Sequence, residues 1–220
     1  MAKYVKMGLG FVRNTAALSK LIAVSTVRWW KVWSKKARKK TPSHVYIWFE
    51  DVSGHRVYFE ALEGVGWRGP LPIENFEEWL GEDEGRWVQD YDLTKWMKGD
   101  VQRQFDFCMD MKDPDYGWVY DTERLALHTR FLGCIGRLFI KSTPNKVICS
   151  EAGARVCYST RLDFREWCKV KQFDNISPAK LLWGVRRLFG ETNTVVDVAR
   201  GWLVDKFKKE KDEEEEKTEV

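Results

Sequence analysis

The sequence lacks several signatures that would place a chain in a functional class directly. Its five cysteines include no CxxC pair and leave one over from any complete set of disulfides, which favours a reduced compartment. No run reaches the roughly 18 apolar residues that span a bilayer. The glycines of "GLGFVRN" are not followed by the Gly-Lys-Ser/Thr of a phosphate-binding loop. Zinc ligands do not cluster at a suitable spacing. We therefore expect no metal and no cofactor.

The first residues also make a poor secretory signal, because Arg13 and Lys20 interrupt their apolar positions. Together with the cysteine pattern, this favours the cytoplasm. The 220 residues are 44% hydrophobic and 14% aromatic, which suffices for a substantial core. We predict a single domain over residues 1–208. The highly charged residues 209–220 have almost no apolar content and are expected to be a disordered tail.

The net charge of +4 is too small to define a partner, but its distribution is uneven. Residues 28–40, "RWWKVWSKKARKK", hold seven Lys or Arg and no acid, and we call them the basic Trp-rich segment. The simplest interpretation is an exposed helix end and linker. A second is peripheral attachment to an anionic membrane, with Trp29, Trp30 and Trp33 at headgroup level. A third is contact with nucleic acid.

Local patterns predict an α+β chain with a small antiparallel sheet or partial barrel packed on helices. The sheet is expected to begin with a hairpin, and the chain from 63 to 100 is expected to be irregular. Turn and capping residues support two of the elements: Gly54 suits the hairpin loop, and Ser177 with Pro178 suits a helix start. The predicted elements are a helix within 15–33, strands at 44–50 and 55–62, a short helix at 73–80, and helices at 93–111 (capped by Thr94), 122–140, 149–160 and 176–189.

The hairpin "SHVYIWFEDVSGHRVYFEAL" separates into two faces, because side chains alternate along a strand. One face of its first strand carries His44, Tyr46, Trp48 and Glu50. A three-residue loop gives a register in which paired residue numbers sum to 106. Glu60 then lies opposite Tyr46 and diagonal to His44, so the carboxylate and the imidazole share a face.

A histidine oriented by a carboxylate is half of a nucleophilic triad, and a thiol or hydroxyl must complete it. Cys149 is the best candidate, since it follows the apolar "VI" and opens a segment with helical apolar spacing. A helix N-terminus and a nearby imidazolium both favour a thiolate. The sequence thus predicts a triad of Cys149, His44 and Glu60.

These motifs resemble the circularly permuted branch of the NlpC-type papain-like cysteine peptidases and amidases, which includes YiiX-like bacterial proteins and viral relatives. The matching residues are Ser43-His44 opening a strand, Glu60-Ala61 ending the next, and Cys149-Ser150-Glu151 at a helix start. The resemblance covers about residues 17–183. It implies a permuted papain-like fold, in which the histidine strand precedes the cysteine helix, and a thiol hydrolase acting on a peptide, isopeptide or other acyl substrate.

Several alternatives stay open at this point. Glu50 or Glu63 could replace Glu60 as the orienting acid. His55 is expected in a surface loop, His128 in an apolar helix, and Cys108, Cys134, Cys157 and Cys168 as core fillers. Lipid-acting acyltransferases and thioesterases also share the permuted fold, and a non-catalytic binding module is the third class of function.

Overall fold

The structure is a computed structural model that describes residues 3–13, 41–62, 65–75, 88–97, 100–113, 117–120, 146–159, 162–173 and 176–191. The chain divides into two compact units, residues 1–185 and 186–220. Several predicted segments lie outside the described residues: the helices at 15–33 and 122–140, the basic Trp-rich segment, and the end of the domain at 208 with the tail beyond it. In the described part, no helix is long and apolar enough to cross a bilayer.

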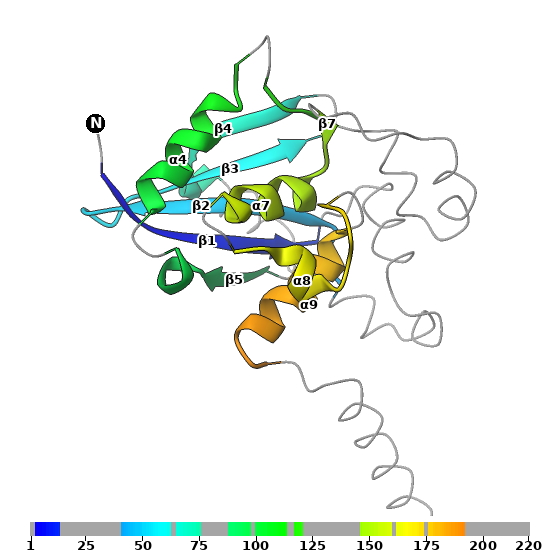
Figure 1. Ribbon diagram of the computed structural model, residues 1–220. Coiled ribbons are helices and arrows are strands. Elements are labelled where there is room, and N and C mark those ends of the chain that lie inside the picture. Colours follow the sequence, from blue (N-terminus) through cyan, green and yellow to red (C-terminus); the bar gives the residue numbers. More distant parts are fainter. Residues whose placement is uncertain are drawn as a thin grey trace, which may run out of the picture. The chain divides into compact units, whose positions relative to one another are not determined.

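A five-stranded antiparallel sheet forms the centre of the first unit (Figure 1). Its strand order is β4-β3-β2-β1-β5. Strands β6 and β7 form a second, two-stranded parallel sheet. The predicted mixed α+β class is therefore confirmed. The strands are β1 (Tyr4–Val12), β2 (His44–Asp51), β3 (Arg56–Leu62), β4 (Gly66–Pro72), β5 (Val88–Asp92), β6 (Val119–Tyr120) and β7 (Lys146–Val147).

Two expectations about the sheet are wrong. The hairpin β2-β3 does not begin it, because β1 precedes the hairpin and pairs with β2. The region 63–100 is not irregular, because it contains β4 and β5 at the two edges of the sheet. Strand β5 pairs with β1, and strand β4 pairs with β3. Both edge strands thus depend on pairing with other segments, which local propensity does not reveal.

The register of the hairpin is as predicted. Glu60 pairs with Tyr46 and Arg56 pairs with Glu50, so the paired residue numbers sum to 106. Asp51 closes the loop, because its Oδ1 accepts hydrogen bonds from the backbone N–H groups of Ser53 and His55. The loop chemistry and the alternation of apolar residues therefore select the same pairing.

From residue 7 to residue 11, strand β1 alternates buried large side chains with glycines. Met7, Leu9 and Phe11 are fully buried. A Cβ atom added to Gly10 would overlap the Tyr46 ring, and one added to Gly8 would overlap the Trp48 ring. The Tyr46 and Trp48 side chains of β2 thus lie across β1 at its glycines, which have no side chain to block them. Tyr46 reaches β5, where its hydroxyl donates a 2.5 Å hydrogen bond to Asp90.

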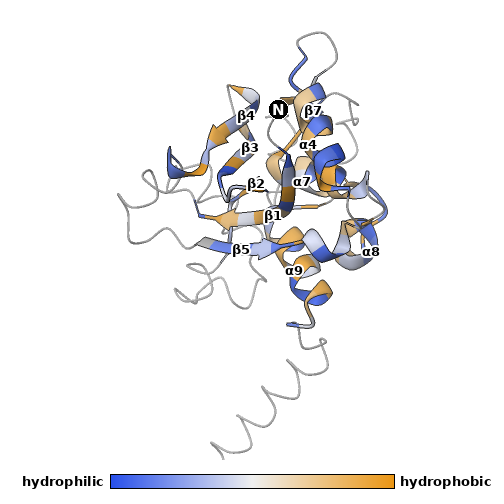
Figure 2. Cartoon of the chain, turned by 90° about the vertical axis from the view of Figure 1, so that its left-hand side faces the viewer, coloured by the Kyte–Doolittle hydropathy of each residue, from blue (hydrophilic) through white to orange (hydrophobic). Residues whose placement is uncertain are grey.

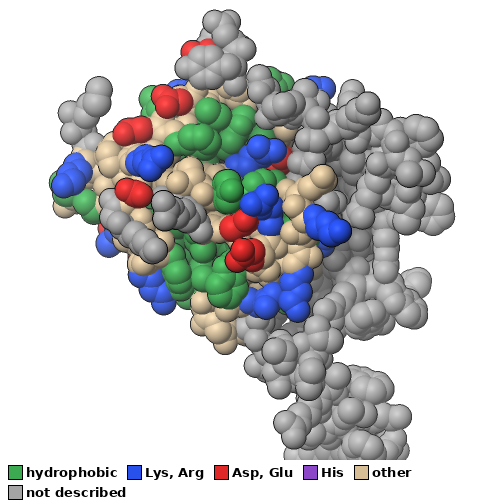
Figure 3. Space-filling model, viewed as in Figure 1, with side chains coloured by type: hydrophobic (Ala, Val, Ile, Leu, Met, Phe, Trp, Pro, Cys, Tyr) green, Lys and Arg blue, Asp and Glu red, His purple; other side chains and the backbone are tan. Residues whose placement is uncertain are grey.

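Helices α4, α7 and α8 lie on one side of the sheet (Figure 2). Helix α7 packs on β2 and β3, and α4 packs on β1. Figure 3 shows the outer surface of this layer, where apolar side chains alternate with Lys, Arg, Asp and Glu. The helices are α4 (Val101–Asp110), α7 (Cys149–Tyr158), α8 (Phe164–Cys168) and α9 (Pro178–Leu188), with a 3-10 turn η2 (Thr94–Trp96).

The predicted helix at 93–111 is in fact two elements, η2 and α4. Thr94 does not cap it: the Thr94 hydroxyl instead accepts a hydrogen bond from the backbone N–H of Met7. The sequence Gly99-Asp100 disfavours a continuous helix, since glycine is a poor helix former. Residues 73–75 are helical as expected, and the rest of that short predicted helix lies outside the described residues.

The two helix starts predicted from capping and packing signals are confirmed. Helix α7 begins at Cys149, one residue after the end of β7. Helix α9 begins at Pro178, and the Ser177 hydroxyl accepts a 3.3 Å hydrogen bond from the Lys180 backbone N–H.

Small residues let α7 approach the sheet closely. Ala152 is fully buried and Gly153 is buried, and a Cβ atom added to Gly153 would lie 3.3 Å from Leu9 and 3.5 Å from Val45. A larger side chain at this position would push the helix away from β1 and β2. The position of Cys149 relative to His44 depends on this close packing.

Candidate active site

His44 and Glu60 form a buried hydrogen-bonded pair on neighbouring strands. His44 is the first residue of β2, and Glu60 lies on β3 opposite Tyr46. The distance from His44 Nε2 to Glu60 Oε2 is 2.6 Å. The Glu60 side chain is only 3% exposed, so the interaction is shielded from water. Of the proposed orienting acids, Glu60 is the one that the structure brings to His44.

Cys149 is the first residue of α7, and it lies near enough to the His44 ring for its charge and hydrogen bonding to raise the pKa of His44. Because Glu60 occupies Nε2, the nitrogen left for the thiol is Nδ1. Cys149 is 4% exposed, so its sulfur is largely sheltered. The structure thus brings together all three residues of the predicted triad, from two adjacent strands and a helix that follows them in the chain.

Cys149 lies in the first turn of α7, at the positive end of the helix dipole. Ile148, the residue before the helix, is extended and offers no side-chain cap. The N–H groups of the first turn have no acceptor within the helix, and they point toward the helix start. The turn is anchored by Ser150, whose hydroxyl donates a 2.7 Å hydrogen bond to the carbonyl of Ile176.

The electrostatics of the site favour a protonated imidazole. Burial alone would lower the pKa of His44. The charge of Cys149 and the hydrogen bonds to Cys149 and Glu60 outweigh burial and raise the pKa of His44 to about 10. The two acidic partners thus favour the protonated ring over the neutral ring.

Glu60 stays ionised despite its burial. Burial opposes ionisation, but the hydrogen bonds and positive charges of His44 and Arg68 outweigh it and hold the pKa of Glu60 below its usual range. Arg68 Nε donates a 2.9 Å hydrogen bond to Glu60 Oε1. This residue was missed by sequence reasoning, because β4 was not predicted. The hairpin register could have revealed Arg68, because a third strand paired with β3 would place a residue directly opposite Glu60, and in the structure that residue is Arg68.

The alternative acids are placed elsewhere or outside the described residues. Glu50 binds Lys6 at 2.5 Å and Arg56 at 2.7 Å, and these two hydrogen bonds are the main reason that its pKa is lowered. Glu63 lies outside the described residues. Glu50 therefore belongs to a separate ion cluster farther along β2.

None of the other histidines and cysteines in the described part of the chain belongs to the site. His55 is in the hairpin loop with its side chain 81% exposed. Cys108, Cys157 and Cys168 are buried and form no disulfide in the described part of the chain, as expected of core residues. Burial raises the pKa of Cys108 and of Cys157, which disfavours their reactive thiolate forms. His128 and Cys134 lie outside the described residues.

No group of three or more His, Cys, Asp or Glu side chains suited to a metal ion occurs in the described part of the chain. What the site offers instead is a thiol, an imidazole and a carboxylate in series. No family model matches the chain, and neither the curated proteins nor the solved structures that were compared with it gave a match.

Proposed function

We propose that this protein is a thiol hydrolase that cleaves an amide or related acyl bond through Cys149, His44 and Glu60. The observation that carries the proposal is the buried series Glu60, His44 and Cys149, with the cysteine at the start of α7. Such a series prepares a nucleophile and a proton donor in the same place. An isolated buried cysteine or strand histidine requires neither partner.

In the proposed reaction the proton already resides on His44, so the Cys149 thiolate attacks the acyl carbon directly. The carbonyl electrons move to oxygen, and the backbone N–H of Cys149 is one donor suited to that oxyanion. When the intermediate collapses, the bond to the leaving amine breaks and His44 Nδ1–H protonates the amine. The product is an acyl-enzyme thioester.

Water then completes the cycle. Neutral His44 accepts a proton at Nδ1 from a water molecule, whose oxygen attacks the thioester carbonyl. The sulfur leaves as thiolate, the acid product is released, and the imidazolium is restored. Glu60 holds the ring through Nε2 in both half-reactions, and its charge stabilises the imidazolium.

A permuted papain-like fold is part of the proposal. It is supported by the order of the elements: the histidine strand β2 comes before the cysteine helix α7, and α7 packs against β2 and β3 of an antiparallel sheet. The same arrangement suits a lipid-acting acyltransferase or thioesterase. Because the basic Trp-rich segment is suited to an anionic membrane, the experiment below also tests a lipid acyl substrate.

The test is alkylation of the folded protein with iodoacetamide at pH 6, followed by peptide mass measurement. We expect Cys149 to react first among the five cysteines. His44→Ala should slow this reaction at least about tenfold, because the imidazolium partner is lost. His55→Ala is the matched control, since His55 is exposed and distant from the thiol, and it should leave the rate unchanged.

Substrate class is then read from trapped acyl-enzyme. An amide substrate predicts a peptide-derived adduct on Cys149, and a lipid substrate predicts a fatty acyl adduct. Glu60→Gln should keep the fold and lower turnover, because an amide holds the ring without stabilising its charge. Earlier alkylation of Cys108 or Cys168 than of Cys149 would overturn the proposed function.

A further inference from the structure

Arg68 and His44 divide the two oxygens of the Glu60 carboxylate between them. Glu60 Oε2 faces His44 Nε2 at 2.6 Å. Glu60 Oε1 accepts from Arg68 Nε at 2.9 Å and also from Arg68 Nη2. The guanidinium therefore donates two hydrogen bonds to Glu60 Oε1, and Glu60 Oε2 remains available to the His44 ring. A carboxylate held in this way cannot rotate without breaking hydrogen bonds to charged groups.

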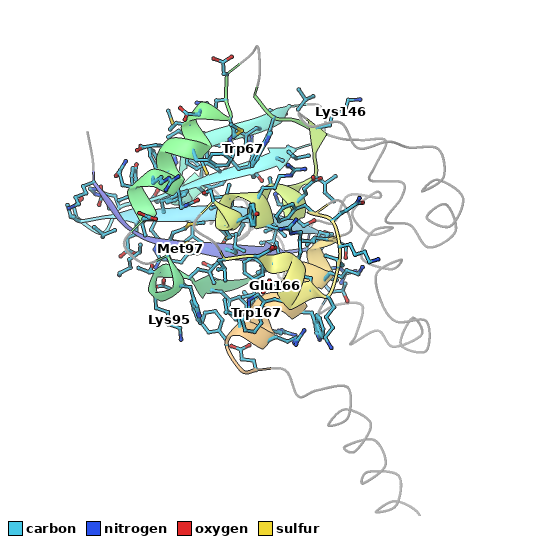
Figure 4. All side chains as sticks on the ribbon, in the orientation of Figure 1. Trp67, Lys95, Met97, Lys146, Glu166 and Trp167 are labelled. Carbon is cyan, nitrogen blue, oxygen red and sulfur yellow. The ribbon has the colours of Figure 1, made fainter. Side chains whose placement is uncertain are left out.

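The backbone places Arg68 for this contact. Arg68 pairs directly with Glu60 across β3 and β4, next to an irregularity in the register. Its neighbour Trp67 points to the opposite side of β4, between the strand and α4, where its indole donates a 2.9 Å hydrogen bond to the carbonyl of Cys108 (Figure 4). With Trp67 fixed on the helix side, the alternation of β4 directs Arg68 to the face that carries Glu60.

Gly69 allows the two strands to meet closely at this point. Its φ of +133° is a conformation that side-chain-bearing residues rarely adopt. A Cβ atom there would lie 2.6 Å from the Phe59 ring and 2.6 Å from the carbonyl oxygen of Tyr58. The local chain is thus adapted to bring β4 against β3 immediately after Arg68.

We propose that Arg68 is a positioning residue of the site, which fixes the Glu60 carboxylate so that its free oxygen orients and charges His44. This inference rests on the proposed function. Arg68 touches neither the thiol nor a substrate in this arrangement. It acts through Glu60, and its side chain, at 40% exposure, reaches the carboxylate from the solvent side of an edge strand.

Two separable effects follow from the geometry. The positive charge of Arg68 favours ionised Glu60, so it sets the pH below which Glu60 takes up a proton and stops stabilising the imidazolium. The two hydrogen bonds from Arg68 fix the plane of the Glu60 carboxylate. They thereby determine the orientation of the His44 ring toward Cys149. A lysine at this position keeps the charge but loses the fork.

Arg56 provides a matched control on the neighbouring strand β3. Its Nε donates a 2.7 Å hydrogen bond to Glu50, and its side chain is 39% exposed, which is nearly the value for Arg68. The Arg56–Glu50 pair does not contact His44 or Cys149. A general effect of losing a strand Arg–Glu pair should therefore appear in Arg56→Gln as well.

The experiment measures the rate of Cys149 alkylation from pH 4 to 9 in the full chain, with peptide mass readout. In Arg68→Gln we expect the low-pH limb of the profile to move upward by about 0.5 pH unit, consistent with a partly exposed ion pair. We also expect the plateau rate to fall about threefold to tenfold. Arg68→Lys should restore the limb but not the plateau. Arg56→Gln should match the wild type.

Thermal unfolding of each variant accompanies the profiles. If Arg68→Gln fails to fold, Arg68→Lys carries the test, because a lowered plateau with an unshifted limb is expected of it alone. Profiles of Arg68→Gln and Arg68→Lys that match Arg56→Gln would overturn the role of Arg68. That result is distinct from failure of the proposed function, which would show as slow Cys149 alkylation in the wild type or as no effect of His44→Ala.

Discussion

His44 is the residue whose protonation links the stability of the fold to the chemistry of the candidate site. It is buried, a condition that by itself disfavours a charged imidazole. Its two nitrogens face Cys149 and Glu60, and these partners overcome the cost of burial. The pair of acidic neighbours, rather than exposure to solvent, decides the charge of the ring.

This arrangement makes the stability of the protein depend on pH in a defined direction. The pKa of His44 is raised from 6.5 to about 10 in the folded chain. The folded state therefore binds this proton more tightly than the unfolded state does. The stabilisation is fully present below about pH 6.5 and is lost as the pH rises through about 10. Denaturant unfolding at pH 6, 8 and 10, compared between wild type and His44→Gln, should show the difference shrinking with pH.

A direct check is NMR titration of the His44 ring. In the wild type the ring should remain protonated at pH 8. In Cys149→Ser the charge and hydrogen bond of the thiolate are absent, so the pKa of His44 should fall. Equal titration of His44 in the two proteins would show that Cys149 does not contact the ring in solution.

At the scale of elements, the site depends on two close approaches made through glycines and small residues. On one side of the sheet, Gly10 lies under the Tyr46 ring in the strand that pairs with β2. On the other side, Gly153 lets α7 approach β1 and β2. The space available differs between these positions, and so should the effect of adding a methyl group.

Gly10→Ala should destabilise the protein by about 1–3 kcal/mol, because the new methyl group overlaps the Tyr46 ring and would displace its hydrogen bond to Asp90. Gly153→Ala should stay within about 1 kcal/mol of the wild type, since its contacts are 3.3 Å or longer and alanine favours the helix. Thermal and urea unfolding measure both. A Gly10→Ala protein as stable as Gly153→Ala would contradict the packing of Tyr46 over β1.

At the scale of the whole molecule, the triad is assembled from segments far apart in the chain. His44 and Glu60 come from one hairpin, and Cys149 comes from a helix that follows it. All three belong to the unit of residues 1–185. The basic Trp-rich segment precedes the hairpin and lies outside the described residues, and its candidate partners predict different binding behaviour.

If residues 28–40 attach the protein to a membrane, binding should require anionic lipid and weaken with salt. Each Lys or Arg gains about 1 kcal/mol near an anionic surface, and salt screens this gain over roughly 8 Å at physiological ionic strength. Burial of Trp29, Trp30 and Trp33 is not screened, so binding that resists salt should disappear when all three are alanine. Co-sedimentation with neutral and anionic vesicles across a salt series measures this.

A short single-stranded oligonucleotide serves as the competing partner. A nucleic-acid site would bind it with a steep dependence on salt and would ignore the vesicles. Binding to none of these partners would support the interpretation of residues 28–40 as a linker.

The sequence by itself determined the parts of the fold that depend on local periodicity. Alternating side chains and a three-residue loop gave the register of β2 and β3, which places Glu60 opposite Tyr46. Apolar spacing located the start of α7 at Cys149, and a serine–proline pair located the start of α9. These features follow from contacts within a few residues or across one tight turn.

Only the tertiary structure decided the pairings between distant segments. It added β1, β4 and β5 to the hairpin, selected Glu60 over Glu50 by giving Glu50 to Lys6 and Arg56, and placed Arg68 on Glu60. Strand pairing between distant segments depends on which side chains pack across the sheet and on the glycines that let them approach, and a local pattern carries little of that information. The contact between Cys149 and His44 has the same origin, because it exists only when α7 lies against β2 and β3.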